Sequence, residues 1–128
     1  MSAQTALKIK IQLLCGSEIA MGPGKADLLD HIDREGSISG AARAMDMSYR
    51  RAWLLVDAMN RCWSEALVST SPGRAKGGGA RLTELGGRVL ERYRTLQTSL
   101  AEVAGEGIME ELDAELRNAP RLKSNEEA

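Results

Sequence analysis

The sequence is poor in the residues that build aromatic cores, disulfide frameworks and metal sites. Its 128 residues include no phenylalanine, one histidine, two cysteines and only 3% aromatic residues. The core must therefore be built from Leu, Ile, Val, Met and Ala, which favours a helix-rich single domain. Cys15 and Cys62 form no CxxC pair, and a single histidine completes no metal-ligand set. We expect two reduced structural thiols and no metal or cofactor.

Targeting and membrane segments are also missing from the sequence. No basic region followed by an apolar run opens the chain. No stretch approaches the roughly 20 apolar residues that a membrane helix needs. We therefore expect a cytoplasmic protein with no membrane partner.

Signatures of catalysis are equally scarce. A phosphate-binding loop needs the pattern GxxxxGK[ST], but Gly24-Lys25 is followed by Ala26, and Ile19 occupies the position of the first glycine. His31 has no nucleophile motif beside it. The sequence therefore predicts no catalytic residues and a protein that is not an enzyme.

The charge is unevenly distributed along the chain. The net charge of −1 and the pI of about 5.9 argue against a strongly basic domain of the kind that binds nucleic acids. However, residues 50–81 hold six basic and two acidic residues, a net +4, and residues 102–128 hold three basic and eight acidic residues, a net −5. Because salt screens charges beyond about 8–10 Å, this distribution matters more than the total.

Apolar periodicity and cap residues predict one strand followed by three helices. Apolar residues alternate with polar ones over residues 6–15, which is typical of a half-buried strand. Gly36 suits a helix C-terminus, and Ser37 or Ser39, and then Ser48, suit helix N-termini. The three predicted helices run from about Pro23 to Gly36, from Gly40 to Met45, and from Ser48 to about Trp63.

A hairpin and a long helix complete the predicted order. Strand-like residues 67–70 and 80–82 flank a glycine-rich segment, and Thr83 can cap a helix with apolar residues spaced by three and four. That helix can continue past Gly105 and Gly107. We therefore predict a mainly α winged helix-turn-helix with a small β-hairpin wing and a long C-terminal dimerisation helix. The predicted parts are an N-terminal strand (1–20), the winged helix-turn-helix (21–83), the dimerisation helix (84–117) and a polar tail (118–128).

Residues 37–56 carry the strongest pattern. Two closely crossing helices need small side chains where they meet, and Ala42 and Ala52 can supply them. Asp46 is one of the few residue types other than glycine that accept a positive φ in the intervening turn. The sulfur and aliphatic side chains of Met45, Met47 and Leu55 would close the space between the helices. A plain antiparallel helix pair can also carry such alanines.

The start of the third helix is the candidate element for reading DNA in the major groove. An arginine there can bond bidentately to guanine, which is worth about 1–3 kcal/mol of discrimination. Hydroxyl groups at a helix N-terminus suit phosphate oxygens. The alternatives are a solvated helix face for the arginines and core packing for the tryptophan. The candidate DNA-binding residues on this helix are Ser48, Tyr49, Arg50, Arg51 and Trp53.

The glycine-rich segment between the two hairpin strands is the second candidate contact. Arg74, Lys76 and Arg81 surround four glycines, so a basic hairpin can lie along a phosphate backbone. The alternative is an ordinary flexible surface loop.

The apolar stripe of the last helix is longer than a small domain alone can cover. A second copy of the chain is the natural cover, and a two-fold dimer matches a palindromic operator with recognition helices about 34 Å apart. The alternative is that the helix folds back on its own domain. Double-stranded DNA and a second copy are thus the expected partners.

Three stretches together resemble the N-terminal domain of the ModE family of molybdate-responsive transcriptional regulators, which is related to the LysR-type winged helix. The resemblance covers about residues 7–103. It implies a homodimer that binds an operator and controls molybdenum-related genes, with an oxyanion sensor in a separate C-terminal module. The stretches are Gly36-Ser37-Ile38-Ser39 with Ala41-Ala42, Ser48-Tyr49-Arg50-Arg51-Ala52-Trp53 with Met59-Asn60, and Gly77-Gly78-Gly79-Ala80-Arg81-Leu82-Thr83 with Gly86.

The chain departs from the family pattern at its C-terminus. Residues 104–128 cannot hold a small β-barrel, so molybdate is not an expected ligand, and we hypothesise a stand-alone DNA-binding member. Two other hypotheses remain open at this point. One is a helical protein-interaction module that uses the acidic C-terminal segment, and the other is an oxyanion-binding protein that uses the glycine-rich loop.

Overall fold

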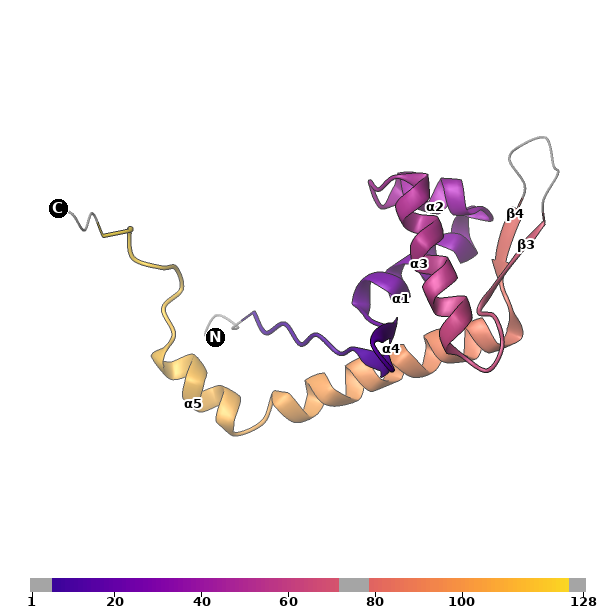
Figure 1. The fold of residues 1–128 in the computed structure, drawn as a ribbon. Coiled ribbons are helices and arrows are strands. Elements are labelled where there is room, and N and C mark those ends of the chain that lie inside the picture. The colour runs from indigo at the N-terminus through magenta and orange to yellow at the C-terminus, as the bar shows by residue number, and fades with distance from the viewer. Residues whose placement is uncertain (1–5, 72–78, 125–128) are drawn as a thin grey trace.

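The computed structural model describes residues 6–71 and 79–124, which form a winged helix-turn-helix with a long helix beneath it (Figure 1). This architecture confirms the predicted mainly α fold class. In order along the chain, the elements are β1 (Leu13–Cys15), β2 (Glu18–Met21), α1 (Pro23–Glu35), α2 (Ile38–Ala44), α3 (Tyr49–Cys62), β3 (Val68–Ser71), β4 (Gly79–Leu82), α4 (Glu84–Ala104) and α5 (Ile108–Glu115).

The core lies between α1, α2, α3 and the first half of α4. Its fully buried side chains are aliphatic or methionine, and Tyr93 is the one aromatic residue in the buried cluster within the described ranges. Such a core was predicted from the absence of phenylalanine in the sequence. The largest fully buried side chains are Met21, Leu28, Leu29, Ile32, Met59 and Leu67.

Local cap signals set the bounds of the first three helices. Gly36 ends α1 in the left-handed conformation with a φ of 76°. Ser37 accepts a hydrogen bond from the backbone N–H of Gly40 at 2.9 Å, so α2 begins at Ile38, two residues before the predicted start. Asp46 has a φ of 58°, as the turn between α2 and α3 requires. Ser48 then accepts a hydrogen bond from Arg51 N at 3.0 Å.

The predicted N-terminal strand over residues 6–15 is wrong for residues 6–12. Only Leu13–Cys15 pair with β2, and the last pair of the ladder is Leu13 with Met21. The next positions opposite this strand are Gly22 and Pro23, where α1 begins. Because Gly22 and Pro23 turn into α1, and proline has no backbone N–H to donate, no strand is available to pair with residues 6–12.

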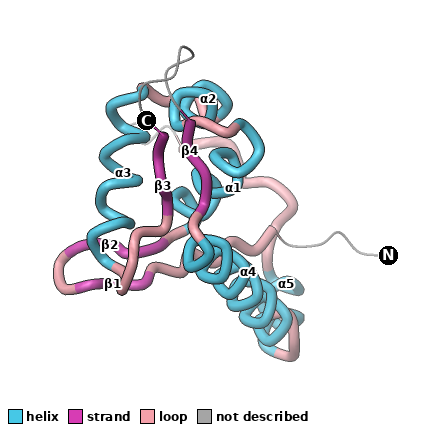
Figure 2. The backbone as a smooth tube through the Cα atoms, turned by 90° about the vertical axis from the view of Figure 1, so that its right-hand side faces the viewer, coloured by secondary structure: helices cyan, strands magenta, loops and turns pink. Residues whose placement is uncertain are grey.

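The wing is the antiparallel pair of β3 and β4. Its register pairs Val68 with Leu82 and Ser71 with Gly79. Three of the four strand bounds lie one residue from the predicted ones, and the end of β4 at Leu82 agrees with the prediction. Figure 2 shows the two strands beside α3, with α4 starting at their base. Ala80 N donates to Gly36 O at 2.9 Å, so β4 is fixed to the junction between α1 and α2.

The single helix predicted over residues 84–117 is also wrong in its second part. Helix α4 ends at Ala104, and Gly107, with a φ of 54°, separates it from α5. Glycine adopts such a positive φ without the steric cost that a side chain would add, so the chain can turn at this position. None of the α5 residues is buried, and Figure 1 shows α5 away from the three-helix body. The residues from Leu116 to Ser124 form no regular structure.

Within the described ranges, no helix is both long and apolar enough to cross a membrane.

Candidate nucleic-acid interface

The start of α3 projects from the body. Tyr49, Trp53 and Leu54 are 55%, 45% and 49% exposed, which is high for side chains of this size and polarity. Together with Arg50 they line one shallow hollow. The spacing of these residues by one and four positions places them on one face of α3, and the buried residues Ala52, Val56 and Met59 form the opposite face. We call Ser48, Tyr49, Arg50, Arg51, Trp53 and Leu54 the α3 tip.

The predicted crossing of α2 and α3 is present. Ala42 on α2 is 2% exposed and Ala52 on α3 is fully buried, as small side chains at a close helix contact should be. Met45, Met47 and Leu55 are partly buried and pack against the core. The packing fixes α3 at a defined angle to α2, so the α3 tip points outward.

The two tryptophans, one on α3 and one just after it, lie in different environments. Trp53 is exposed, so the alternative of core packing for this residue is wrong. Trp63, just after α3, packs against the core instead, and its Nε1 donates a hydrogen bond to Ala20 O at 3.1 Å. A buried indole N–H needs such a partner, whereas that of Trp53 is left to solvent or a ligand.

Ser48 has two roles at the α3 tip. Its Oγ accepts the capping bond from Arg51 N at 3.0 Å, which fixes the side chain at the end of the helix. The hydroxyl proton is not used by this bond and can be donated to a phosphate oxygen. The exposed first turn of α3 adds free backbone N–H groups, which favour an anion at the same place.

Exposed cations lie on the α3 tip and on the wing. Arg50 and Arg51 are exposed on α3, and Arg81 is exposed on β4, opposite Ser69. Burial lowers the pKa of Lys25 at the start of α1, whereas Cys62 and Glu18, which lie near it, raise this pKa. The predicted wing contacts Arg74 and Lys76 lie outside the described residues.

Sequence reasoning missed one cation of this surface, Arg43 in the last turn of α2. It is exposed, and no ion pair involves it among residues 6–71 and 79–124. The first helix of a helix-turn-helix crosses the DNA backbone, so Arg43 is placed for a phosphate contact. Arg43 directly follows Ala41-Ala42, so its position in the helix-turn-helix motif could have identified it from the sequence.

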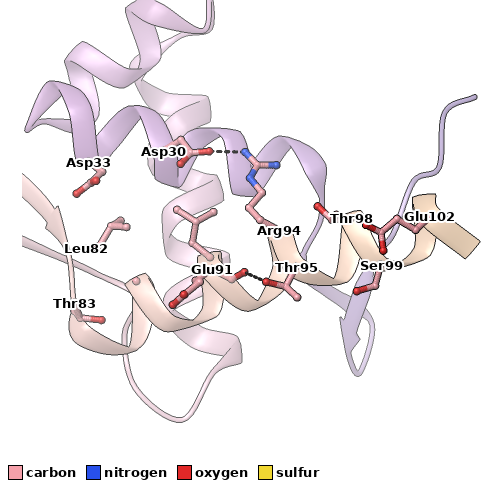
Figure 3. Close-up of a pocket in the computed structure, with 12 residues that line it drawn as sticks. Asp30, Asp33, Leu82, Thr83, Glu91, Arg94, Thr95, Thr98, Ser99 and Glu102 are labelled. Carbon is pink, nitrogen blue, oxygen red and sulfur yellow. Dashed lines mark hydrogen bonds and ion pairs between the residues drawn. The ribbon is translucent and has the colours of Figure 1, made fainter. Parts of the chain in front are cut away.

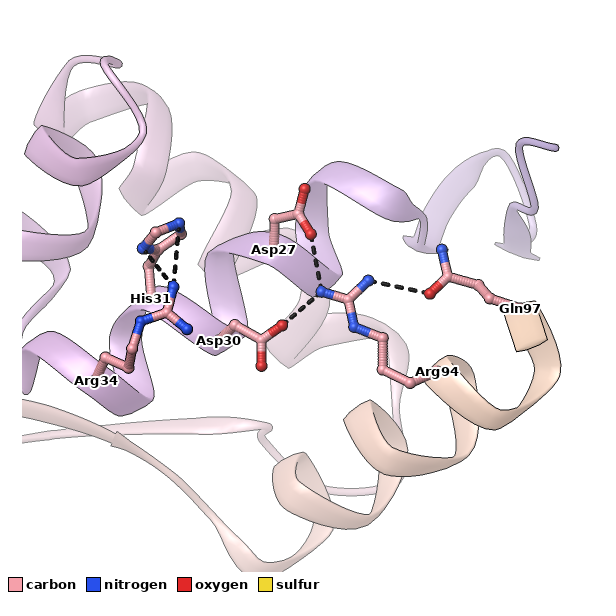
Figure 4. Close-up of polar contacts among 6 residues, drawn as sticks. All are labelled: Asp27, Asp30, His31, Arg34, Arg94 and Gln97. Atoms are coloured by element: carbon pink, nitrogen blue, oxygen red, sulfur yellow. Dashed lines mark hydrogen bonds and ion pairs between the residues drawn. The ribbon is translucent and has the colours of Figure 1, made fainter. Parts of the chain in front are cut away.

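A groove of 890 Å³ runs between α1 and α4 (Figure 3). Arg94 is its one basic residue among the described residues that line it, whereas four of the lining residues carry carboxylates, namely Asp30, Asp33, Glu91 and Glu102. Arg94 already donates to Asp27 at 2.8 Å, to Asp30, and to Gln97 at 3.0 Å (Figure 4). This groove is therefore unsuited to an oxyanion.

The chain is similar to several ModE-type and Mop-type proteins over part of their length. No family model matches the chain. It is 41% identical over 78 residues to the molybdenum transport protein ModE of Azotobacter vinelandii, covering 61% of this chain and 29% of that protein. It is 40% identical over 83 residues to the molybdenum-pterin-binding protein MopB of Rhodobacter capsulatus, covering 65% and 31%. It is 35% identical over 96 residues to the DNA-binding transcriptional dual regulator ModE of Escherichia coli K12, covering 75% and 35%.

A solved structure agrees with the sequence relatives. The full-length LTTR LysG of Corynebacterium glutamicum, with bound effector Arg, aligns with a TM-score of 0.52 at 27% identity, over 75% of this chain and 30% of that one. The chain is a relative of the ModE regulators. The resemblance predicted from the sequence is thus confirmed. The chain spans about a third of the length of the ModE-type relatives it matches.

The ModE-type residues Met59 and Asn60 have structural roles that explain their place in the motif. Met59 is fully buried in the core. Asn60 Oδ1 accepts hydrogen bonds from Leu67 N at 2.8 Å and Val68 N at 3.1 Å, and its Nδ2 donates to Val68 O at 3.2 Å. One side chain on α3 therefore satisfies the backbone at the start of β3 and sets the position of the wing beside the α3 tip.

The ModE-type residues Thr83 and Gly86 join the wing to α4. Thr83 Oγ1 accepts a hydrogen bond from Gly86 N at 3.0 Å and donates one to Ala66 O at 2.7 Å. A Cβ atom on Gly86 would lie 2.1 Å from Leu67 O, so only glycine fits this close approach. The family motif thus describes a rigid corner between β3, β4 and α4.

Among the described residues, no group of three His, Cys, Asp or Glu side chains could hold a metal ion.

Proposed function

We propose that the chain is a sequence-specific DNA-binding transcriptional regulator linked to molybdenum-related genes. The observation that carries the proposal is the α3 tip, an exposed surface of hydroxyl, aromatic and guanidinium groups on the second helix of a helix-turn-helix. Relatives named as transcriptional regulators match about three quarters of the chain at 35–36% identity. No catalytic role, metal or cofactor is part of the proposal.

The α3 tip has the chemistry to read bases and to position the protein on the backbone. Arg50 can bond two acceptors of one guanine, and the exposed Leu54 and Trp53 can contact thymine methyl groups. The Ser48 and Tyr49 hydroxyls suit phosphate oxygens. The wing adds Arg81, and we keep Arg74 and Lys76 as proposed phosphate contacts on sequence grounds.

We propose that the chain binds its operator as a homodimer through α4 and α5. Leu96, Leu100 and Val103 follow one stripe of α4 and are 36%, 40% and 68% exposed. Ile108, Leu112 and Leu116 continue the apolar surface and are about 60% exposed. Apolar stripes at this spacing are typically covered by another helix, and a second copy supplies the same stripe. A two-fold dimer of this kind would read a palindromic operator.

The link to molybdate rests on the names of the relatives. They are described as molybdenum transport, molybdenum-pterin-binding and ModE proteins. The groove between α1 and α4 does not suit an oxyanion, so we propose that these residues bind DNA without binding molybdate themselves. A cytoplasmic location follows from this proposed role.

Selection of DNA from a random pool tests the proposal directly. We expect the purified chain to enrich one palindromic sequence, with the same result in the presence and absence of molybdate. A variant in which Tyr49, Arg50 and Trp53 are all replaced by alanine is the matched control, because these exposed side chains leave the core untouched. Failure of the unmodified chain to enrich any sequence would contradict the proposal, and enrichment that depends on molybdate would contradict its last part.

A further inference from the structure

The two cysteines of the chain lie side by side, although they are far apart in the sequence. Cys15 ends β1 and Cys62 ends α3. The Cys62 thiol is close enough to the Cys15 thiol for Cys15 to shift its pKa, and neither cysteine forms a disulfide. This proximity was not predicted, because nothing local in the sequence connects the two positions.

Contacts on both sides of Cys62 hold the end of α3 against the β1–β2 hairpin. Arg61 Nη2 lies 3.6 Å from Glu18 Oε2, and Trp63 Nε1 donates to Ala20 O at 3.1 Å. Glu18 is in turn the cross-strand partner of Cys15. Because residues 61 and 63 are both bound to β2, Cys62 between them is held beside the hairpin that carries Cys15.

The two thiols differ in their access to solvent. Cys15 is exposed, whereas Cys62 is half-buried. Burial raises the pKa of the Cys62 thiol, and the contact with Cys15 raises it further. Because Cys15 is exposed and Cys62 is half-buried, Cys15 is the thiol that a dissolved oxidant meets first and Cys62 is the one that reacts second.

We propose that Cys15 and Cys62 are a modification site, an oxidisable dithiol that closes to an intrachain disulfide when it meets a two-electron oxidant of the peroxide class. The Cys15 thiolate attacks one oxygen of hydrogen peroxide, the O–O bond breaks, and Cys15 becomes a sulfenic acid; the departing hydroxide takes up the proton that the Cys15 thiol released on ionising and forms the first water. The Cys62 sulfur then attacks the Cys15 sulfur, the S–O bond breaks, and the departing hydroxide takes the Cys62 proton to form a second water. Two thiols are oxidised and one peroxide is reduced.

The bond would close a loop that contains α1, α2 and nearly all of α3. A cross-link around these helices removes conformational freedom from the unfolded chain and so raises stability. The α3 tip is at the opposite end of α3, about 20 Å away at 1.5 Å per residue, and takes no part in the reaction. In a reducing compartment the disulfide would form transiently and be reversed by thiols.

Intact mass measurement after treatment with hydrogen peroxide tests the inference on the full chain. After denaturation and alkylation, we expect a product lighter than the reduced chain by two hydrogen atoms, with no alkylated cysteine and a Cys15–Cys62 cross-linked peptide. It should migrate as a single chain on a non-reducing gel and unfold at a higher urea concentration, and dithiothreitol should reverse both changes. Added oxygen atoms without loss of both thiols, or links between chains, would overturn the inference.

Two serine variants separate the proposed order of attack from simple surface oxidation. In Cys62→Ser, the Cys15 sulfenic acid has no resolving thiol and should be trapped by dimedone. In Cys15→Ser, the half-buried Cys62 should react several-fold more slowly, and peroxide should not change the urea midpoint. Equal dimedone labelling rates in the two variants would contradict the order of attack.

Discussion

The two halves of α4 carry the same kind of apolar pattern but have different surroundings. In the first half, Gly86, Val89 and Tyr93 are buried against the three-helix body. In the second half no residue is buried, and Leu96, Leu100 and Val103 are exposed. The contrast teaches that helical periodicity tells which face of a helix needs a cover, but not whether the same chain provides it.

The first half of α4 should be intolerant of any added atom at Gly86. In Gly86→Ala, the new Cβ would lie 2.1 Å from Leu67 O, so the corner between β3 and α4 must shift. We expect a loss of about 3 kcal/mol in the free energy of unfolding, measured by urea titration. Gly87→Ala is the matched control, because nothing lies within 4 Å of its Cβ, and it should gain up to about 1 kcal/mol. Similar effects of the two substitutions would show that the close approach does not exist in solution.

A charged substitution in the second half of α4 should instead leave the fold of the single chain intact and weaken the proposed dimer. Leu100→Glu places a charge in the proposed dimer contact, and two-fold symmetry counts the loss twice. At about 1.5 kcal/mol for each buried leucine, we expect the dissociation constant of the dimer to rise about 100-fold in analytical ultracentrifugation. Leu122→Glu, at a leucine that is 95% exposed beyond α5, should leave it unchanged. A dimer unaffected by Leu100→Glu would move the interface away from α4.

The exposed groups of the α3 tip extend the comparison, because their proposed partner is DNA and not a second copy of the chain. In Arg50→Ala we expect a loss of about 1–3 kcal/mol in affinity for the selected DNA and little change on random DNA, measured by fluorescence anisotropy. Arg81→Ala on the wing should weaken both kinds of DNA alike and reduce the salt dependence by about one phosphate contact. If Arg50→Ala weakened both alike, Arg50 would be a backbone contact and not a base reader.

Structural features that depend on only a few neighbouring residues were predicted well. Ser37 and Ser48 cap helices, Asp46 forms the turn and Gly36 ends α1, because each effect depends on a residue and its near neighbours. These caps were enough to define the helix-turn-helix and the start of the α3 tip. They could also be combined with a family resemblance that covered the same stretches.

Features that depend on distant partners were not predicted. The strand expected over residues 6–15 failed because its partner becomes α1 after Met21. The exposure of Trp53 and the burial of Trp63 depend on which side of α3 the hairpin occupies, and the contact between the two cysteines depends on the same packing. The predicted last helix is interrupted near Gly107, where φ is positive, and helical periodicity gives no information about that angle.

Tyr93 marks the boundary between the two halves of α4 and gives the smallest predicted effect. Its hydroxyl donates to Ile11 O at 2.6 Å, so Tyr93→Phe should lower stability by about 1 kcal/mol at neutral pH. Burial raises the pKa of Tyr93 in the folded chain, whereas the unfolded value is about 10. The stability from this group is therefore complete below about pH 10 and is lost as the pH rises through the folded pKa.

Urea titrations across that alkaline range should show a shallower decline for Tyr93→Phe than for the unmodified chain. Tyr49→Phe is the matched control, because Tyr49 is 55% exposed and its hydroxyl has no partner among the described residues. It should change neither the neutral stability nor the alkaline slope. Parallel curves for Tyr93→Phe and the unmodified chain would mean that the hydroxyl of Tyr93 is solvated, and that the packed half of α4 ends before this residue.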